Sequence, residues 1–140
     1  MSAPKQMFIK GIYTPKLSLD VYETRPLEEE GKQIEYSLSH RFIEIDDNAG
    51  HTDLRFQIAK EADMGFVAEV VVSAVFEVEN YKENYEGLYL MKNTAITILY
   101  PYLRNAVSQL CSLAGVMKVT SPVIDTIQTF GDKTVSADNP

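Results

Sequence analysis

The sequence predicts an α+β fold. We expect a four-stranded antiparallel sheet, with one long Pro-interrupted helix and one short C-terminal helix packed on one side of it. Apolar residues alternate with a period of two through residues 7–79, which is typical of half-buried strands. Over residues 88–130 they recur at helical spacing instead. The 140 residues suit a single domain, 1–140, ending in a flexible polar tail at 132–140.

The first predicted strand covers Met7–Val21, where most odd positions are apolar. Pro15 lies inside it and marks a bulge or an edge position, because proline cannot donate a ladder hydrogen bond. In the next strand the apolar positions change from even to odd between Leu38 and Ile43, which predicts a bulge near Ser39–Phe42.

The third strand alternates at Leu54, Phe56 and Ile58, after a turn at residues 46–50. The fourth, Phe66–Glu79, has the strongest pattern in the chain. One of its faces is wholly apolar: Phe66, Ala68, Val70, Val72, Ala74, Phe76 and Val78. The turns between strands are too short for crossover helices, so the sheet is predicted to be antiparallel.

The long helix is predicted over Leu88–Ala114, which contains only two charged residues. Pro101 should kink or interrupt it. One apolar stripe is Leu88, Met91, Ala95, Leu99, Tyr102, Ala106 and Leu113; a second is Ile96, Leu103, Val107, Leu110 and Ala114. Because a surface helix needs only one stripe, the second predicts cover by something other than its own sheet.

The short C-terminal helix is predicted between Ser121, a suitable N-cap, and Gly131, a suitable stop. Pro122 fits its first position, and Val123, Ile127 and Phe130 would share one face.

Acidic charge is concentrated in the middle of the chain. The net charge is −7, but residues 20–86 alone hold 17 acids and 6 bases, a local excess of −11. This segment is either an ordinary solvated surface or a docking surface for a basic partner. Its acidity argues against duplex nucleic acid. The segment Met1–Lys10 lacks the apolar core of a secretion signal, so we expect a cytoplasmic protein.

No residue set predicts catalysis, a metal site or a cofactor. Cys111 lies among helical apolar positions and is expected to be an inert buried thiol. His40 and His51 have no metal-ligand spacing. Because no set of residues predicts catalysis, we expect that the protein is not an enzyme. Four tyrosines have doubtful burial, and they predict either half-buried packing or an apolar groove for extended chains. They are Tyr22, Tyr81, Tyr85 and Tyr89.

Three segments together resemble the SecB family of protein-export chaperones. The first is Phe-Ile-Lys-Gly-Ile-Tyr-Thr at residues 8–14, followed by Leu-Ser-Leu-Asp at 17–20. The second is Ile-Thr-Ile-Leu-Tyr-Pro-Tyr-Leu-Arg at 96–104, and the third is Ser-Pro-Val-Ile at 121–124. Their order and spacing extend the resemblance over Met7–Phe130.

The resemblance implies an ATP-independent holdase that keeps unfolded preproteins export-competent for the SecA motor ATPase, assembled as a dimer of dimers. It implies groove walls at Tyr22, Leu27, Ile34, Tyr36, Leu38, Val123, Ile127 and Phe130. It implies an acidic docking face at Asp20, Glu69, Glu77 and Glu79. The second helical stripe would then be the oligomer interface, through Ile96, Leu103, Val107 and Leu110. Atypical members of the family serve an antitoxin, so a chaperone or adaptor dedicated to one such partner is the alternative hypothesis.

Overall fold

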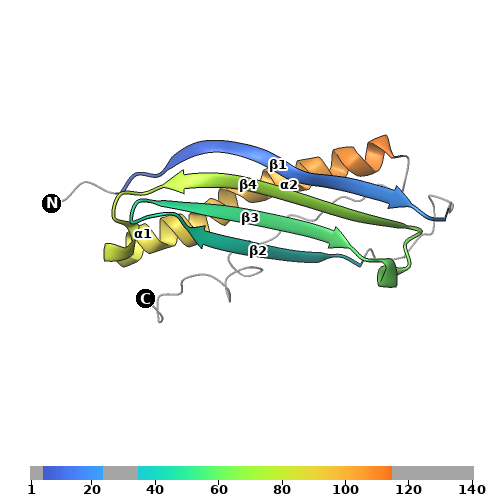
Figure 1. Ribbon diagram of the computed structural model, residues 1–140, viewed down its shortest axis with the longest axis horizontal. Coiled ribbons are helices and arrows are strands. Elements are labelled where there is room, and N and C mark those ends of the chain that lie inside the picture. Colours follow the sequence, from blue (N-terminus) through green and yellow to red (C-terminus); the bar gives the residue numbers. More distant parts are fainter. Residues whose placement is uncertain (1–4, 24–34, 115–140) are drawn as a thin grey trace.

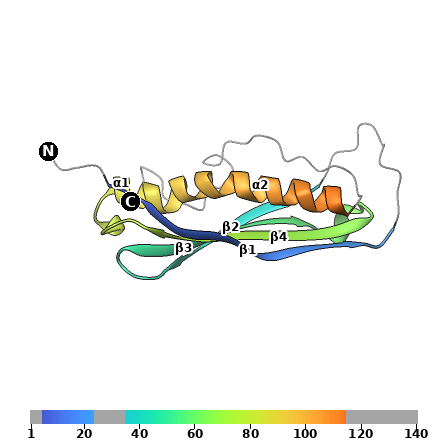
Figure 2. The same cartoon turned by 90° about the horizontal axis from the view of Figure 1, so that it is seen from above.

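The computed structural model describes residues 5–23 and 35–114. Four strands form one antiparallel sheet in the order β1-β4-β3-β2 (Figure 1). The strands are β1 (Phe8–Val21), β2 (Ser37–Glu44), β3 (Ala49–Ile58) and β4 (Phe66–Glu77). The helices cover one face of this sheet, as the view from above shows (Figure 2). The predicted fold class is therefore confirmed. The predicted second helix and the tail lie outside the described residues.

The helical layer follows β4 after one 3₁₀ turn, η2 (Tyr81–Glu83); a similar turn, η1 (Lys60–Ala62), joins β3 to β4. Three helical segments then follow one another: α1 (Tyr85–Tyr89), the π-helical η3 (Leu90–Thr94) and α2 (Ala95–Leu113). The first begins at Tyr85, before the predicted Leu88, because the Asn84 side chain accepts a hydrogen bond from the Gly87 N–H at 2.8 Å.

Strand β4 is the centre of the core. Its seven predicted apolar positions from Phe66 to Val78 are all buried beneath the helices, and Val70, Ala74, Phe76 and Val78 are completely inaccessible. Neighbouring strands on both sides and α2 above it remove this face from water. The strict alternation of the sequence is thus a reliable guide here.

Strand β1 is an edge strand with two irregularities in its pairing with β4. One lies between Ile9 and Ile12, where Gly11 has a φ of 146°, a conformation that favours glycine. The other lies between Tyr13 and Lys16 and contains Pro15, so the predicted bulge or edge position is confirmed. These irregularities break the alternation that the sequence suggested.

Strand β2 contains no bulge, and the predicted one near Ser39–Phe42 is wrong. Its pairing with β3 is continuous from Ser37 to Glu44. His40 and Phe42 continue the helix-side row that starts at Leu38, while Ile43 faces the other side and is 42% exposed. The apparent change of phase arises because a histidine takes an inward position and an isoleucine an outward one.

Helix α2 continues through Pro101 rather than breaking there. Proline leaves the carbonyl of residue 97 without its intrahelical donor. Both Thr97 and Pro101 are exposed, so water can solvate that carbonyl. The irregular turn is η3, which lies before α2.

Part of the second helical stripe packs on the sheet of its own chain. Ile96, Leu103 and Val107 are only 2%, 1% and 1% exposed, and they pack into the core of their own sheet. Leu110 is half-buried against the same core. Side chains that their own chain covers have little surface left for a subunit contact, which argues against placing these three residues at an oligomer interface. The exposed apolar residues of α2 are Tyr102 and Leu113 instead.

Candidate functional site

An exposed apolar row lies on the helix side of β1. Ile9, Leu17 and Val21 pair with buried residues of β4, so their side chains share the face that the helices cover. They nevertheless remain 43%, 54% and 48% exposed, because α2 packs mainly over β3 and β4. We call these three residues the β1 apolar row. Tyr22, which follows β1, is 41% exposed.

The β1 apolar row borders a strand edge that has no neighbour within the described sheet. Such an edge presents backbone N–H and C=O groups that can pair with another extended chain. At 14 residues, β1 is also the longest strand of the sheet. The combination of this strand edge with apolar side chains fits an extended apolar polypeptide.

The described residues of the predicted groove fall at the two opposite edges of the sheet. Tyr22 follows β1, and its hydroxyl accepts a hydrogen bond from the Gly65 N–H at 3.3 Å. Tyr36 precedes β2 and stacks on Phe56 with ring centroids 5.3 Å apart, and Leu38 packs on the core. Two strands separate these edges, which places them at least roughly 14 Å apart.

The structure therefore does not bring Tyr22 beside Tyr36 and Leu38. The other predicted groove residues lie outside the described parts of the chain: Leu27, Ile34, Val123, Ile127 and Phe130. Among the tyrosines of doubtful burial, Tyr81 is only 1% exposed, whereas Tyr85 is 41% exposed.

The sheet face opposite the helices is charge-balanced, which we call the outer face. Register and ion pairing place four bases on it together with four acids. The bases are Lys10, Lys16, Arg41 and Arg55, and the acids are Asp20, Asp53, Glu69 and Glu77. Of the acids predicted to form a docking face, Glu69 pairs with Lys16 at 3.1 Å and Arg55 at 3.3 Å. Glu77 pairs with Lys10 at 3.5 Å.

A further group of acids lies at one end of the sheet. The β2–β3 turn carries Asp46 and Asp47, and Glu79 follows β4. Asn48 joins these segments, since its backbone oxygen accepts from the Val78 N–H at 2.8 Å and its side-chain oxygen from the Asn80 N–H at 2.8 Å. We call this region the acidic end. The acids at this end are Glu44, Asp46, Asp47, Glu79, Glu83 and Glu86.

Tyr81 reports the electrostatics of the acidic end. Its pKa is raised above the usual value of 10.0, first because the ring is buried and then because Asp47 and Asp46 repel the phenolate. Its ring also contacts Phe42 edge-on, with centroids 6.3 Å apart.

A polar network centred on Asp53 links all four strands on the outer face. The Asp53 carboxylate accepts hydrogen bonds from the Ser73 hydroxyl and from Arg41 Nε and Nη2, the last at 2.8 Å. His51 Nε2 lies 3.2 Å from Asp53 and 3.0 Å from the Tyr13 hydroxyl. Ser73 is fully buried and Asp53 is 8% exposed. Ser73 donates to the aspartate and not to the histidine, so this network does not have the Ser–His hydrogen bond of a catalytic triad.

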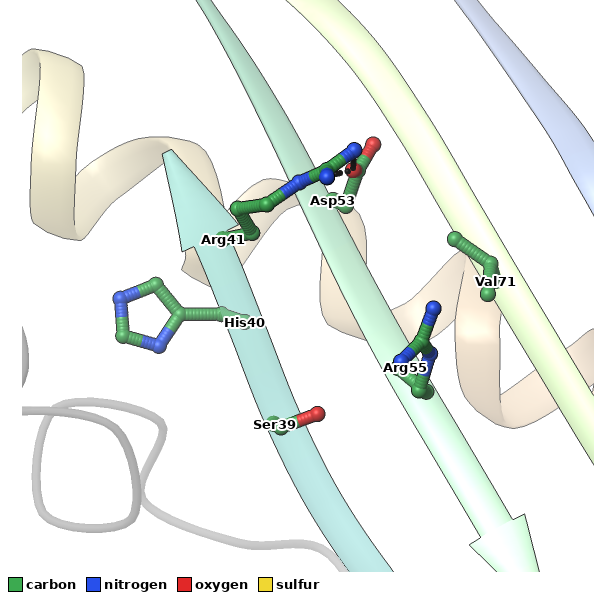
Figure 3. Close-up of a pocket in the computed structure, with 6 residues that line it drawn as sticks. All are labelled: Ser39, His40, Arg41, Asp53, Arg55 and Val71. Carbon is green, nitrogen blue, oxygen red and sulfur yellow. Dashed lines mark hydrogen bonds and ion pairs between the residues drawn. The ribbon is translucent and has the colours of Figure 1, made fainter. Parts of the chain in front are cut away.

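A depression of about 140 Å³ opens beside this network. Its walls are Ser39 and Arg41 from β2, Asp53 and Arg55 from β3, and Val71 from β4 (Figure 3). His40 borders it too, but its side chain projects away from the other five (Figure 3). We call this feature the arginine depression. Sequence reasoning missed it, although the alternation of β3 already placed Asp53 and Arg55 on one face.

No group of metal-ligating side chains occurs within residues 5–23 and 35–114. Cys111 is buried, as predicted, at 1% exposure. In the same part of the chain, no helix has the length and apolar character needed to cross a membrane.

Comparison with family models decides the relationship, because the model for SecB, the preprotein translocase subunit, matches residues 1–135. The chain belongs to the SecB family. This membership supports a chaperone function. No curated protein matches the chain.

A solved structure of a SecB-like chaperone has the same fold. The chain is similar to the Rv1957 SecB-like chaperone of Mycobacterium tuberculosis, solved in complex with a peptide from the HigA1 antitoxin. The TM-score is 0.62 at 17% identity, covering 84% of this chain and 90% of that one. A protein of unknown function from Streptococcus agalactiae matches with a TM-score of 0.48 and 12% identity, covering 86% of this chain and all of that one.

Proposed function

We propose that this SecB-family member is an ATP-independent holdase that binds unfolded polypeptides along β1. The single observation that carries this proposal is the β1 apolar row beside a strand edge that has no neighbour among the described strands. An extended client would add its backbone to the edge of β1. Its apolar side chains would lose water against Ile9, Leu17 and Val21, at about 25 cal/mol per Å² buried.

Low sequence specificity follows from this mode of binding. Backbone pairing is independent of side-chain identity, and apolar burial requires size and hydrophobicity rather than one sequence. No step calls for nucleotide hydrolysis or any other turnover, so the protein acts in this proposal as a binder and not as an enzyme.

We extend the proposal to a partner: the chain would deliver preproteins to SecA in the cytoplasm. A basic partner would find its complement at the acidic end, where Glu79 lies, rather than on the charge-balanced outer face. Loss of SecA binding with intact holdase activity would remove this partner and leave the chaperone proposal standing.

Assembly into a homo-oligomer, a dimer of dimers, is proposed with contacts other than Ile96, Leu103 and Val107. Tyr102 and Leu113 are 52% and 87% exposed on α2 and are the apolar residues there available to a second copy.

A chaperone dedicated to an antitoxin is the second candidate. The similar Rv1957 chaperone was solved with an antitoxin peptide, and this likeness favours the candidate. A single tight client in a pull-down, without general holdase activity, would support it over the first proposal.

The holdase proposal is tested by aggregation of a chemically denatured preprotein, followed by light scattering at stoichiometric amounts of the chain. We expect the wild type to suppress scattering and Leu17→Asp to lose most of this effect, because a carboxylate in the β1 apolar row opposes apolar burial. Ser18→Asp is the matched control: it adds the same charge at the next residue, which pairs with Glu69 on the outer face. Wild-type protein that leaves aggregation unchanged would refute the proposal.

A further inference from the structure

The arginine depression has the shape and lining of a small anion site. Arg41 and Arg55 stand at its rim on adjacent strands, and Val71, only 7% exposed, contributes an apolar wall (Figure 3). Register explains the arrangement. Arg41 pairs with Asp53, and Ser39 pairs with Arg55, so the two guanidinium groups lie diagonally across β2 and β3 on the outer face.

Positive charge exceeds negative charge around this depression. Three cations, Lys16, Arg41 and Arg55, share the two carboxylates of Asp53 and Glu69. The Asp53 carboxylate also accepts from Ser73, so its negative charge is well covered by donors. The arginine side chains are 68% and 53% exposed, and they can therefore reach a group that arrives from solvent.

We infer that the arginine depression binds one carboxylate, the Asp or Glu side chain of an extended polypeptide that crosses the outer face. A volume of about 140 Å³ suits a single side chain. Arg41 and Arg55 would donate charge-assisted hydrogen bonds to the carboxylate, and Val71 would contact its methylene groups. The site lies on the opposite side of the sheet from the β1 apolar row, so it adds a second recognition surface.

The surrounding surface favours an acidic apolar peptide over a nucleic acid. Ile43 lies two residues beyond Arg41 on the same face of β2 and is 42% exposed, so it can receive an apolar neighbour of the bound carboxylate. A phosphate backbone would instead meet the interspersed acids Asp53 and Glu69 and a chain of net charge −7. The local surplus is one positive charge, which matches one carboxylate.

Binding of two synthetic peptides by the whole chain tests this inference, with fluorescence anisotropy as the readout. The peptides are short, extended and rich in Val and Thr, and they differ only by Glu or Gln at the central position. We expect the Glu peptide to bind about tenfold more tightly, the effect of one charge-assisted hydrogen bond. Arg55→Gln should abolish that preference, and Glu69 keeps Lys16 as its partner in this variant.

Lys10→Gln is the matched control. It removes the same charge from the same face but at the Glu77 pair, away from the depression. It should retain the tenfold preference. Equal affinities of the two peptides for the wild type, or equal losses in the two variants, would overturn the inference. A single-stranded oligonucleotide that bound more tightly than the Glu peptide and lost affinity in Arg55→Gln would overturn it too. The assay needs no unfolded client, so its outcome is separate from that of the holdase test.

Discussion

Leu103→Ala separates the two possible roles of the second helical stripe. If Leu103 faces a second subunit, its truncation should weaken assembly. In the structure it is 1% exposed and packs with the core of its own chain. The substitution should therefore destabilise the fold itself.

The magnitude follows from complete burial. Truncating a buried leucine removes its transfer free energy and leaves a cavity, with a total cost of about 2–5 kcal/mol. We expect a loss of about 3 kcal/mol in the free energy of unfolding. With a urea m-value of about 2 kcal/mol/M, the unfolding midpoint should fall by about 1.5 M.

Urea titration followed by far-UV circular dichroism measures this loss, at two protein concentrations. Leu113→Ala, at a position 87% exposed on the same helix, is the control and should change the free energy by less than about 0.5 kcal/mol. A loss for Leu103→Ala that is confined to low protein concentration would show that the residue contributes to assembly. Equal effects of the two substitutions would also refute the reasoning.

Three further predictions concern the close approaches and polar contacts of the chain. Gly87→Ala should lower stability by about 1–3 kcal/mol, because an added Cβ would lie 2.6 Å from the Tyr81 carbonyl oxygen; an unchanged melting temperature would contradict this. The wild type should lose stability above about pH 10, because the tyrosine ionises in the unfolded chain while the buried Tyr81, with its raised pKa, stays protonated. Tyr81→Phe should remove this loss. Identical urea midpoints of variant and wild type through this pH range would refute the prediction. Asp53→Ala should cost about 1–3 kcal/mol by leaving the buried Ser73 hydroxyl without its acceptor, whereas Arg41→Ala, at an exposed side chain, should cost less than about 1 kcal/mol; the reverse order in urea titrations would disprove it.

The sequence predicted β4 and β1 correctly, because one clear feature determined the structure of each strand. The alternation of β4 identified its core face, and Pro15 identified an irregular edge strand, because a missing donor has few places in a sheet. The pattern failed in β2, where His40 occupies an inward position and Ile43 an outward one. Residue polarity is a poor guide on an edge strand, where both faces are partly exposed.

Helix α2 shows a second limit of prediction from apolar periodicity. Both of its stripes are apolar, and periodicity alone does not say which stripe faces the sheet of the same chain. In the structure both stripes contribute to the core, through Met91, Ala95 and Leu99 from the first and Ile96, Leu103 and Val107 from the second, whereas Tyr102 is exposed. The arginine depression could not be predicted from the sequence, for a related reason. It depends on the register of β2 against β3, which sets Arg41 beside Asp53 and Ser39 beside Arg55.

The location of charge bears directly on the choice of partners. A segment with an excess of −11 suggested an acidic sheet, but the strands carry enough bases to balance the outer face. Six acids of this segment lie at the acidic end, and a local surplus of base lies at the arginine depression. Two surfaces of opposite sign can select different partners on one small domain. A basic partner should therefore dock without competing with an acidic peptide, and simultaneous binding of both would follow from this separation.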